Sequence, residues 1–401
     1  MSHRLLSLCL ATLLLISSPG RGESAANPML HQEGTHIVNG ADKPIKLRGV
    51  NLGGWLMWEG LILGETSVPE ADLQKNLTSL TSFKSAHQFR TRFYDNFITE
   101  ADIARISNLG FNCVRVPLDY RLLINRSRTS IDTPQGLTLI DHLLDWCESH
   151  QVYVILDLHA APGGQSKLFV DDSDTTSLNL WQSDSKQKET VTLWKTLAAR
   201  YKNRTIIAGY DILNEPSPPD GKILADFYGR IIRAIRSEDT RHLILVQGGK
   251  LGTDFSMFPF PPDANMAYSI HLYNWFGDNR KKRLDECQTL ATNQSVPIWV
   301  GEFGENTYDM ISSTITMMAA HDAVTGWAYW TWKKAPTRFP GINTIKIPAV
   351  WETLDKWLAQ PDQPPLKPSF VNNAMDEFID SIKLGNTSTD SKMVDLLQHS
   401  K

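Results

Sequence analysis

The sequence predicts a single α/β domain folded as a (β/α)8 TIM barrel. Two observations predict it: eight short apolar runs rich in β-branched residues follow one another along the chain, and helical patterns lie between most of them. Near-continuous apolar runs, as opposed to alternating ones, are typical of parallel strands buried on both faces. Eight such units are most economically closed into a barrel, and a doubly wound open sheet is the alternative fold.

The predicted strands and helices alternate in order. The strands cover residues 46–52, 112–118, 152–159, 207–215, 242–248, 266–273, 297–303 and 326–333. Thr99 is the expected N-cap of the helix that precedes the second strand, in which Ile103 and Ile106 face inward and Gly110 ends the helix. Further apolar stripes lie at Ile140, Leu143, Leu144 and Cys147; at Val191, Trp194, Leu197, Ala198 and Tyr201; at Ile223, Phe227 and Ile231; at Leu284, Cys287, Leu290 and Ala291; and at Val350, Leu354, Trp357 and Leu358. The segment 251–265 between the fifth and sixth strands is short and Pro-rich, so we expect the helix there to be missing or rudimentary.

The two ends of the chain are expected to lie outside this domain. Residues 1–25 resemble a secretory signal peptide, with basic His3 and Arg4, an apolar stretch at 5–16 and small residues after it; a buried N-terminal element is the alternative. The apolar stretch is too short to span a bilayer, and no later stretch is long and apolar enough. Residues 26–384 then form the barrel domain, and residues 385–401 are predicted to be a polar, poorly ordered C-terminal tail. We therefore expect export to the extracellular space or the periplasm.

The composition narrows the class of protein. Hydrophobic residues make up 41% and charged residues 21%, as in a globular protein with a large core. The formal charge of −4 offers no basic surface for nucleic acid. Once Cys9 leaves with the signal peptide, three cysteines remain, enough for one disulfide but not for a disulfide framework. N-glycosylation sequons, which matter only in a eukaryotic secretory pathway, lie at Asn76, Asn125, Asn203, Asn293 and Asn386.

Titratable and aromatic residues gather where the predicted strands end, and that face of a barrel carries its site. They are Asn51, Glu59, Arg115, Asp157, His159, Asn214, Glu215, His271, Tyr273, Glu302 and Trp330. Carboxylates, an aromatic wall and a buried cation are typical of a pocket that hydrolyses sugars. We expect no cofactor and no metal at such a site. Asp157 and His159, on one face of a strand, suggest a metal-dependent hydrolase as a rival, but no second histidine pair at ligand spacing supports it.

Glu215 and Glu302 are the most informative residues, because each closes an apolar run and a buried carboxylate is costly without partners. They end the fourth and seventh predicted strands, which lie roughly opposite each other in a closed barrel. Glycosidic cleavage needs one carboxylic acid to protonate the leaving oxygen and one carboxylate to attack or to activate water. We expect Glu215 to be the acid, and Glu302, with Arg115 and Tyr273 as donors, to be the nucleophile. The alternative is that both are loop-edge charges in salt bridges.

Together these motifs resemble glycoside hydrolase family 5, the cellulase-like retaining glycosidases. The resemblance rests on Asn-Glu-Pro at 214–216 and Gly-Glu-Phe-Gly at 301–304, and it extends from residue 48 to residue 333. It implies a catalytic domain with Glu215 as acid/base and Glu302 as nucleophile. It also implies Arg115 and Tyr273 beside the nucleophile, the residues His159, Asn214 and His271 lining the site, and Trp330 as the floor.

One branch of the family matches further. Arg-Gly-Val-Asn-Leu-Gly-Gly-Trp at 48–55, followed by Glu59, and His-Ala-Ala-Pro-Gly-Gly-Gln at 159–165 resemble the exo-β-1,3-glucanase branch. This implies that Glu59 contacts the terminal glucose. Two features depart from that branch: Gly-Glu-Phe-Gly is common in the family at large, and the acidic insert at 166–188 matches nothing in its pattern.

The expected function is a retaining glycoside hydrolase that cleaves β-glucosidic bonds of β-glucan, similar to exo-β-1,3-glucanases. An endo-β-1,4-glucanase is the alternative, followed by a non-catalytic carbohydrate-binding barrel. The expected partner is a β-glucan polysaccharide or oligosaccharide, with no nucleic acid and no membrane span. The oligomeric state stays open.

Overall fold

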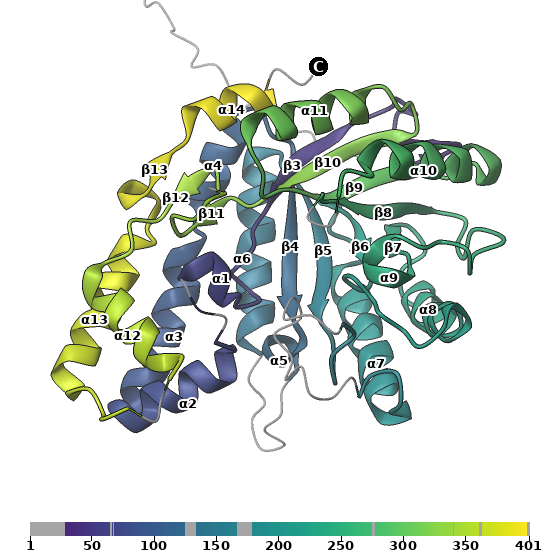
Figure 1. Cartoon of the computed structure of the whole chain (residues 1–401). Coiled ribbons are helices and arrows are strands. Elements are labelled where there is room, and N and C mark those ends of the chain that lie inside the picture. Colours follow the sequence, from purple (N-terminus) through teal and green to yellow (C-terminus); the bar gives the residue numbers. More distant parts are fainter. Residues whose placement is uncertain are drawn as a thin grey trace, which may run out of the picture.

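The computed structural model describes residues 29–398 except 65, 67, 125–133, 167–178, 275–276, 340 and 361–362. The predicted signal peptide therefore lies outside the described residues, as does the sequon at Asn125. The domain is a closed barrel of eight parallel strands with helices around it (Figure 1). This confirms the predicted (β/α)8 fold.

The barrel strands match the predicted runs closely. They follow the order β10-β3-β4-β5-β6-β7-β8-β9, and the parallel pairing of β3 with β10 closes the barrel. Their bounds are β3 (Leu47–Asn51), β4 (Cys113–Asp119), β5 (Tyr153–Ala160), β6 (Ile207–Asp211), β7 (Leu243–Gln247), β8 (Met266–Leu272), β9 (Ile298–Gly304) and β10 (Val324–Trp330). Apart from half-buried Arg48 in β3, every residue in these strands is buried, which explains their continuous apolar character.

Glycines let the strands on both sides of β3 approach each other closely. A Cβ atom on Gly49 would lie 1.9 Å from the carbonyl oxygen of Cys113 in β4. A Cβ atom on Gly326 in β10 would lie 2.0 Å from the carbonyl oxygen of Leu47. Neither position has room for a side chain, so both glycines are needed where the first strand joins its neighbours.

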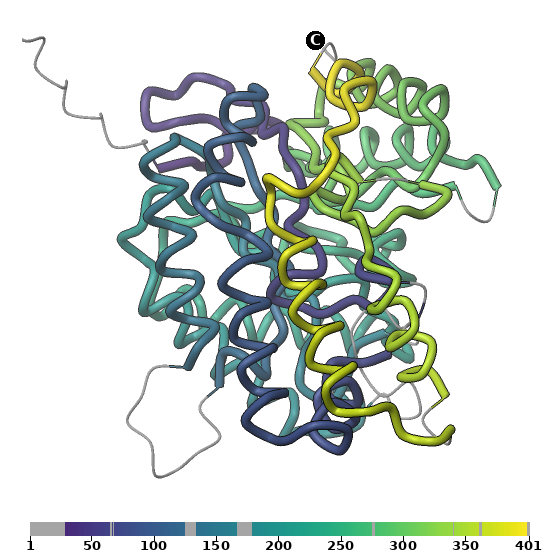
Figure 2. The backbone as a smooth tube through the Cα atoms, turned by 90° about the vertical axis from the view of Figure 1, so that its left-hand side faces the viewer, coloured from purple at the N-terminus to yellow at the C-terminus, as the bar shows by residue number. Residues whose placement is uncertain are grey.

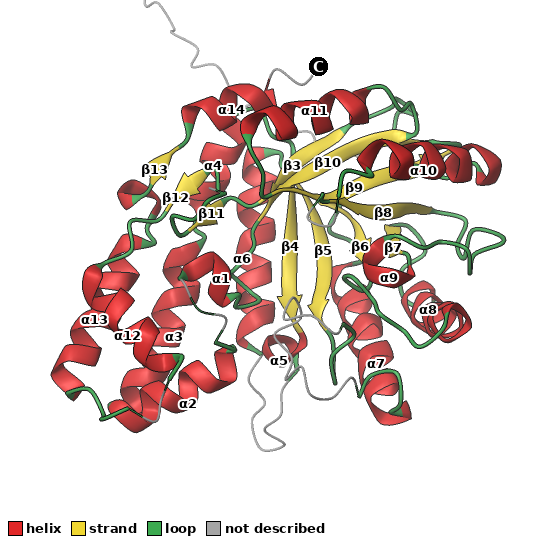
Figure 3. Cartoon of the chain, viewed as in Figure 1, coloured by secondary structure: helices red, strands yellow, loops and turns green. Residues whose placement is uncertain are grey.

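Helices surround the barrel (Figure 3), and they cover the segments in which the sequence predicted apolar stripes. Thr99 is the N-cap of α4, as predicted, and the carboxylate of Asp102 accepts hydrogen bonds from its backbone N–H and its hydroxyl. Between β7 and β8 there is only the four-residue α9, in which Lys250 and Leu251 have left-handed backbones, so the missing helix is confirmed. The bounds are α4 (Glu100–Asn108), α5 (Tyr120–Leu123), α6 (Gln135–His150), α7 (Asp184–Tyr201), α8 (Gly221–Arg236), α9 (Gly249–Gly252), α10 (Arg280–Gln294), α11 (Tyr308–Ala319) and α12 (Ala349–Leu358).

A further helical layer covers one side of the barrel. It consists of α1 (Gly60–Leu63), α2 (Glu70–Leu80) and α3 (Phe83–Phe97) with α12 and α13 (Pro368–Ser381). Figure 2 shows the C-terminal segment lying along these N-terminal helices. Aromatic rings join them, because Phe378 of α13 stacks on Trp351 with ring centroids 3.9 Å apart and lies 6.5 Å from Phe93 of α3. Helices α12 and α13, late in the sequence, thus cover the same side of the barrel as the early helices α2 and α3.

The C-terminal residues are ordered, so the predicted disordered tail is wrong as far as Gln398. They form the 3-10 turn η2 (Leu384–Asn386), β13 (Ser388–Thr389) and α14 (Ser391–Gln398). Strand β13 pairs with β12 (Asn343–Thr344), which pairs with β11 (Lys333–Lys334). Helix α14 buries Met393, Val394 and Leu397, an apolar stripe inside an otherwise polar segment.

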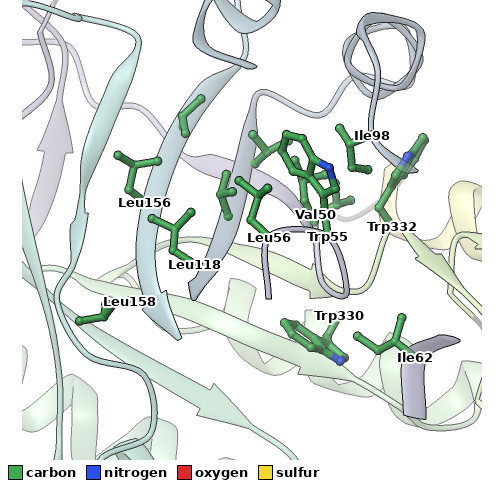
Figure 4. Close-up of a cluster of buried hydrophobic side chains, with 14 of the residues drawn as sticks. Val50, Trp55, Leu56, Ile62, Ile98, Leu118, Leu156, Leu158, Trp330 and Trp332 are labelled. Carbon is green, nitrogen blue, oxygen red and sulfur yellow. The ribbon is translucent and has the colours of Figure 1, made fainter. Parts of the chain in front are cut away.

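Two short elements and one large core complete the domain. The hairpin of β1 (His31–Glu33) and β2 (His36–Val38) precedes the barrel. Buried residues that follow the ends of β3 and β10, such as Trp55 and Trp332, extend the barrel core toward the outer helices (Figure 4). The three described cysteines, Cys113, Cys147 and Cys287, are buried and free, so no disulfide joins them. Among the described residues no helix is both long and apolar enough to cross a membrane.

Candidate active site

The strand ends bring the predicted site residues together at one face of the barrel. Arg115, Asp157 and His159 lie on β4 and β5, His271 on β8, Glu302 on β9 and Trp330 at the end of β10. Glu215 is the exception to the prediction, because β6 ends at Asp211 and not at residue 215. The chain leaves the barrel before Glu215, whose φ of 44° places it in the left-handed region. Non-glycine residues with such a backbone are uncommon and gather at functional sites.

Glu302 is held at both carboxylate oxygens. The Nη1 of Arg115 donates to its Oε1 at 2.6 Å, and the hydroxyl of Tyr273 donates to its Oε2 at 3.0 Å. The side chain of Arg115 is fully buried and that of Glu302 is nearly so. A charge-assisted hydrogen bond of this kind is strong and fixes the orientation of the carboxylate. These are the two donors that the sequence predicted for Glu302.

Arg115 is the hub of a buried polar network. Its guanidinium donates to Asn51 at 3.1 Å and to Asn214 at 2.8 Å, and it forms ion pairs with Asp157 and Asp211, each at 3.1 Å. Burial alone would lower the pKa of this guanidinium, but the carboxylates of Asp157, Asp211 and Glu302 raise it above its ordinary value. The cation is therefore permanently charged and rigidly placed.

Glu215 lies in different surroundings. Its backbone N–H donates to the Oε1 of Gln247 at 2.9 Å, and its own Oε1 lies 2.7 Å from the Nδ1 of His271. Burial raises the pKa of Glu215 to about 7, and burial lowers the pKa of His271 to about 4. Near neutral pH the histidine is thus uncharged, and the Glu215 carboxyl keeps a substantial protonated fraction.

The two carboxyl groups face each other across a short gap. One carboxylate oxygen of Glu215, one of Glu302 and a ring nitrogen of His271 all lie within 4.8 Å of one another. Retaining glycosidases hold their two carboxyl groups roughly 5–5.5 Å apart, whereas inverting ones need about 6.5–9.5 Å to admit a water. Because one oxygen of each group lies within 4.8 Å of the other, the pair fits the retaining spacing better than the inverting one.

Gly301 makes room for this arrangement. A Cβ atom at this position would lie 2.8 Å from the Oγ of Ser269 and 3.2 Å from the Nε2 of His271. The residue before Glu302 must therefore be a glycine if His271 is to remain between the two carboxyl groups. This contact explains the first glycine of the Gly-Glu-Phe-Gly motif in terms of packing.

His159 and Trp330 form one wall of the site. Their rings stack with centroids 5.6 Å apart and an interplanar angle of 11°. The Nδ1 of His159 lies 2.6 Å from Asp157, and its Nε2 lies 3.2 Å from the amide nitrogen of Asn214. Asp157 bonds both His159 and Arg115, so the pair that suggested a metal site instead belongs to the network that holds the arginine.

Glu59 stands at one edge of the site, at the N-cap of α1. Burial, followed by the nearby carboxylate of Glu305, raises the pKa of Glu59 to about 8, although Lys334 opposes the shift. Lys334 is almost fully buried and forms an ion pair with Glu305. The charges of Glu302 and Glu215 also raise the pKa of Glu59, so this predicted residue lies within electrostatic range of both carboxylates.

Sequence reasoning missed several members of the network: Asp211, Gln247, Glu305 and Lys334. Gln247 donates to Asp211 at 3.1 Å and to the side-chain oxygen of Asn214 at 3.4 Å, so it links the arginine hub to the Glu215 loop. Asp211 and Gln247 end buried strands in the structure. In the sequence they lie inside the predicted runs 207–215 and 242–248, so they lacked the signal that singled out Glu302. Glu305 directly follows β9, whereas Lys334 lies in the short strand β11, and neither residue carries such a signal.

Comparison with known proteins places the chain in a family. Residues 73–336 match the family Cellulase (glycosyl hydrolase family 5). The chain belongs to glycosyl hydrolase family 5. A β-glucanase structure from Saccharophagus degradans has a similar fold, with a TM-score of 0.55 at 18% sequence identity over 91% of this chain and 98% of that one.

Three relatives with similar sequences carry the names of three different enzymes. A β-xylosidase of Phanerodontia chrysosporium is 32% identical over 292 residues, which are 69% of this chain and 61% of the relative. Endoglucanase C of Acetivibrio thermocellus is 28% identical over 251 residues, 62% and 63% of the two chains. A probable glucan 1,3-β-glucosidase A of Emericella nidulans is 30% identical over 274 residues, 64% and 67% of the two. The chain thus spans less than two thirds of the first two relatives.

Proposed function

We propose that the chain is a retaining β-glycosidase that acts on β-glucan in the manner of an exo-β-1,3-glucanase. The observation that carries the proposal is the pair of buried carboxyl groups within 4.8 Å of each other in unequal surroundings. The Glu302 carboxylate accepts hydrogen bonds from the Arg115 guanidinium and the Tyr273 hydroxyl. Burial instead raises the pKa of the Glu215 carboxyl to about 7. Such unequal surroundings support Glu215 as the acid and Glu302 as the nucleophile.

The reaction follows from these roles. The Glu302 carboxylate attacks the anomeric carbon while Glu215 gives its proton to the leaving oxygen, so that a glycosyl ester forms on Glu302 and an alcohol departs. Glu215, now ionised, takes a proton from water, and that water attacks the same carbon and releases Glu302. Two inversions give net retention. His271 stays uncharged between the carboxyl groups, and the Trp330 ring forms the floor for the reacting sugar.

An exo mode of attack is supported by the edge of the site at Glu59. An exo enzyme needs one end of its cleft to be closed, whereas an endo enzyme needs an open groove. Glu305, Lys334 and the two glutamates all act electrostatically on Glu59, and a partly buried ion pair holds Glu305 and Lys334 in place. Glu59, with its raised pKa, can both donate and accept a hydrogen bond to a sugar hydroxyl.

Product analysis tests the exo mode. Purified protein is incubated with laminarin, carboxymethyl-cellulose and xylan, and the products are separated by size over time. We expect a single small sugar from laminarin from the earliest time points. Oligomers of mixed length would contradict the exo mode and favour the endo-β-1,4-glucanase alternative, which the similarity to endoglucanase C supports.

A β-xylosidase is a second candidate, because the relative of that name is 32% identical. The fold and the carboxyl pair serve both sugars, which differ by one hydroxymethyl group. Aryl β-glucoside and aryl β-xyloside compared under the same conditions decide between them through the ratio of kcat/KM. We expect the glucoside to be preferred, and a preference for the xyloside would replace the proposed sugar without changing the mechanism.

The remaining alternative is a carbohydrate-binding barrel without catalysis, and turnover that depends on Glu302 would exclude it. The Glu302→Gln variant keeps the shape of the site and removes the nucleophile. Activity of the wild type that is lost in this variant supports catalysis at Glu302, while equal activity of both proteins would contradict the assignment. We also propose that the protein is exported through residues 1–25, and secretion of the full chain but not of one lacking these residues tests this.

A further inference from the structure

The peptide bond between Asn214 and Glu215 is held from both sides by the side chain of a glutamine. The Nε2 of Gln165 donates to the carbonyl oxygen of Asn214 at 3.1 Å. The backbone N–H of Glu215 donates to the Oε1 of Gln247 at 2.9 Å. Both glutamines are fully buried, and we call the two residues the glutamine clamp. The catalytic steps proposed above use neither side chain.

The partners of Gln165 determine which end of its amide faces Asn214. A backbone N–H only donates, and a carbonyl oxygen only accepts. The Oε1 of Gln165 accepts from the backbone N–H of Ala161 at 3.0 Å. Its Nε2 must therefore face the carbonyl oxygens of His159, at 2.6 Å, and of Asn214. Turning the amide over would break all three hydrogen bonds, so this half of the clamp has a single arrangement.

Gln247 joins the clamp to the buried polar network. Because its Oε1 accepts from Glu215, its Nε2 faces the Asp211 carboxylate at 3.1 Å and the side-chain oxygen of Asn214 at 3.4 Å. Arg115 donates to the same oxygen of Asn214 at 2.8 Å. The amide of Gln247 is thus fixed by partners on both of its ends, and one of them is also held by the buried cation.

A clamped peptide plane sets the backbone angle of the residue that follows it. The peptide unit is planar, so one hydrogen bond on its carbonyl oxygen and another on its N–H fix the rotation of the whole plane. Glu215 follows this plane with a φ of 44°, in the left-handed region. Such a backbone is costly for a non-glycine residue and persists only where the surroundings impose it. A released plane would turn the carboxyl of Glu215 away from His271, which it contacts at 2.7 Å.

We propose that Gln165 and Gln247 are positioning residues that aim the Glu215 carboxyl at the leaving oxygen. The proposal rests on the proposed function, in which Glu215 is the general acid. It also gives a role to the last residue of the His-Ala-Ala-Pro-Gly-Gly-Gln motif at 159–165. A misplacement of about 1 Å can lower a rate roughly 10²-fold, so the loss of one side of the clamp should slow proton donation.

The test compares a leaving group that needs a proton with one that does not. The value of kcat/KM is measured for a methylphenyl and a dinitrophenyl β-glycoside of the sugar that the wild type cleaves, and the readout is the ratio of the first to the second. Gln165→Met and Gln247→Met each remove the hydrogen bonds of one side chain while keeping a similar size. Gln294→Met is the matched control at the end of the barrel where β9 begins, since Gln294 also donates to a backbone carbonyl and accepts from a hydroxyl.

We expect the ratio to fall about tenfold or more in both clamp variants and to keep the wild-type value in Gln294→Met. A smaller amount of folded enzyme lowers both values of kcat/KM equally, so it does not change the ratio. A ratio unchanged in both clamp variants, while Glu215→Gln lowers it, would overturn the clamp alone. A ratio that Glu215→Gln leaves unchanged, or a wild type inactive on both glycosides, would instead overturn the proposed function.

Hydrogen exchange in the wild type gives a second reading that does not depend on the folding of any variant. The backbone N–H of Glu215 is buried and bonded to Gln247, so it should exchange with D2O as slowly as the amides of β6. Mass spectrometry at single-residue resolution measures this rate. Exchange as fast as that of exposed loop amides would contradict the clamp.

Discussion

At the scale of single residues, the chemistry depends on how differently two glutamates are surrounded. Glu302 shares its oxygens with Arg115 and Tyr273, whereas Glu215 meets a neutral histidine and has a pKa raised by burial. The sequence singled out both glutamates because a carboxylate that closes an apolar run is costly without partners, and their roles as acid and nucleophile are our proposal. It could not predict that Glu215 lies in the loop after β6, since the run from 207 to 215 looks continuous while the strand ends at Asp211.

The Glu215 carboxyl should control the alkaline limb of the pH profile. A general acid is active when protonated, so with a pKa of about 7 the value of kcat/KM should fall as the pH rises through about 7. Glu215→Gln should remove this limb and lower kcat/KM for oligosaccharides by roughly 10²–10⁴-fold. With a dinitrophenyl glycoside, whose leaving group needs no proton, the loss in the first step should be much smaller. An alkaline limb that persists in the variant would contradict the assignment.

Arg115 should matter for stability as well as for activity. Arg115→Met leaves Asp157, Asp211 and Glu302 buried without a cation, which should lower the free energy of unfolding by roughly 3–5 kcal/mol. Arg115→Lys keeps the charge but cannot reach all of these acceptors, so kcat should fall even where the fold survives. Urea unfolding and kinetics measure both effects. Arg230→Met, at a half-buried surface arginine that pairs with Asp184, serves as control and should cost less than about 1 kcal/mol.

At the scale of elements, the strands and the strongly amphipathic helices could be predicted, and the rest depends on tertiary packing. Helices α2 and α3 cover a side of the barrel that no motif announces, and their apolar faces pack against α13 and Trp351 of α12, which come late in the sequence. Helix α11 is rich in Thr, Ser and Met, so its apolar stripe is less distinct. The prediction of a disordered C-terminal tail failed for the same reason. Three apolar residues in a polar segment are enough to anchor α14 once β13 has paired with β12.

The order of the tail leads to a measurable cost. Met393 of α14 is fully buried, so Met393→Ala should reduce the free energy of unfolding by about 2–5 kcal/mol. Gln398 donates to the carbonyl oxygen of Leu109, which ties the end of the helix to the body of the protein. Urea denaturation gives the value, with the exposed Lys392→Ala as control. A change below about 0.5 kcal/mol, typical of surface substitutions, would mean that α14 does not contribute to the fold.

At the scale of the whole molecule, ionising the buried carboxyl groups of the site costs free energy, and the rest of the fold must offset this cost. Burial raises the pKa of Glu59 to about 8 and that of Glu215 to about 7, so the folded state binds these protons more tightly than the unfolded state. Their contribution to stability is complete at low pH and is lost as the pH rises through 7 to 8. The pKa values of His159 and His271, lowered to about 4, act in the opposite direction but only below pH 6.5.

The melting temperature should therefore fall between about pH 6.5 and pH 8.5, where only the carboxyl terms remain. Glu59→Gln should make this fall shallower, because the amide does not ionise. The exposed Glu377→Gln is the control and should leave the slope as in the wild type. Differential scanning calorimetry over this range measures the slopes, and an unchanged slope in Glu59→Gln would show that Glu59 is ionised in the folded protein.

The covalent intermediate on Glu302 is the central claim, and a trapped glycosyl-enzyme tests it most directly. The protein is treated with a 2-deoxy-2-fluoro-β-glycosyl fluoride, digested and mapped by mass spectrometry. We expect one fluorosugar per chain, attached through an ester to Glu302 and absent from Glu302→Gln, because a carboxylate this close to the acid attacks the sugar itself. A label on any other residue, or turnover of the substrate with inversion of the anomeric centre, would contradict this assignment.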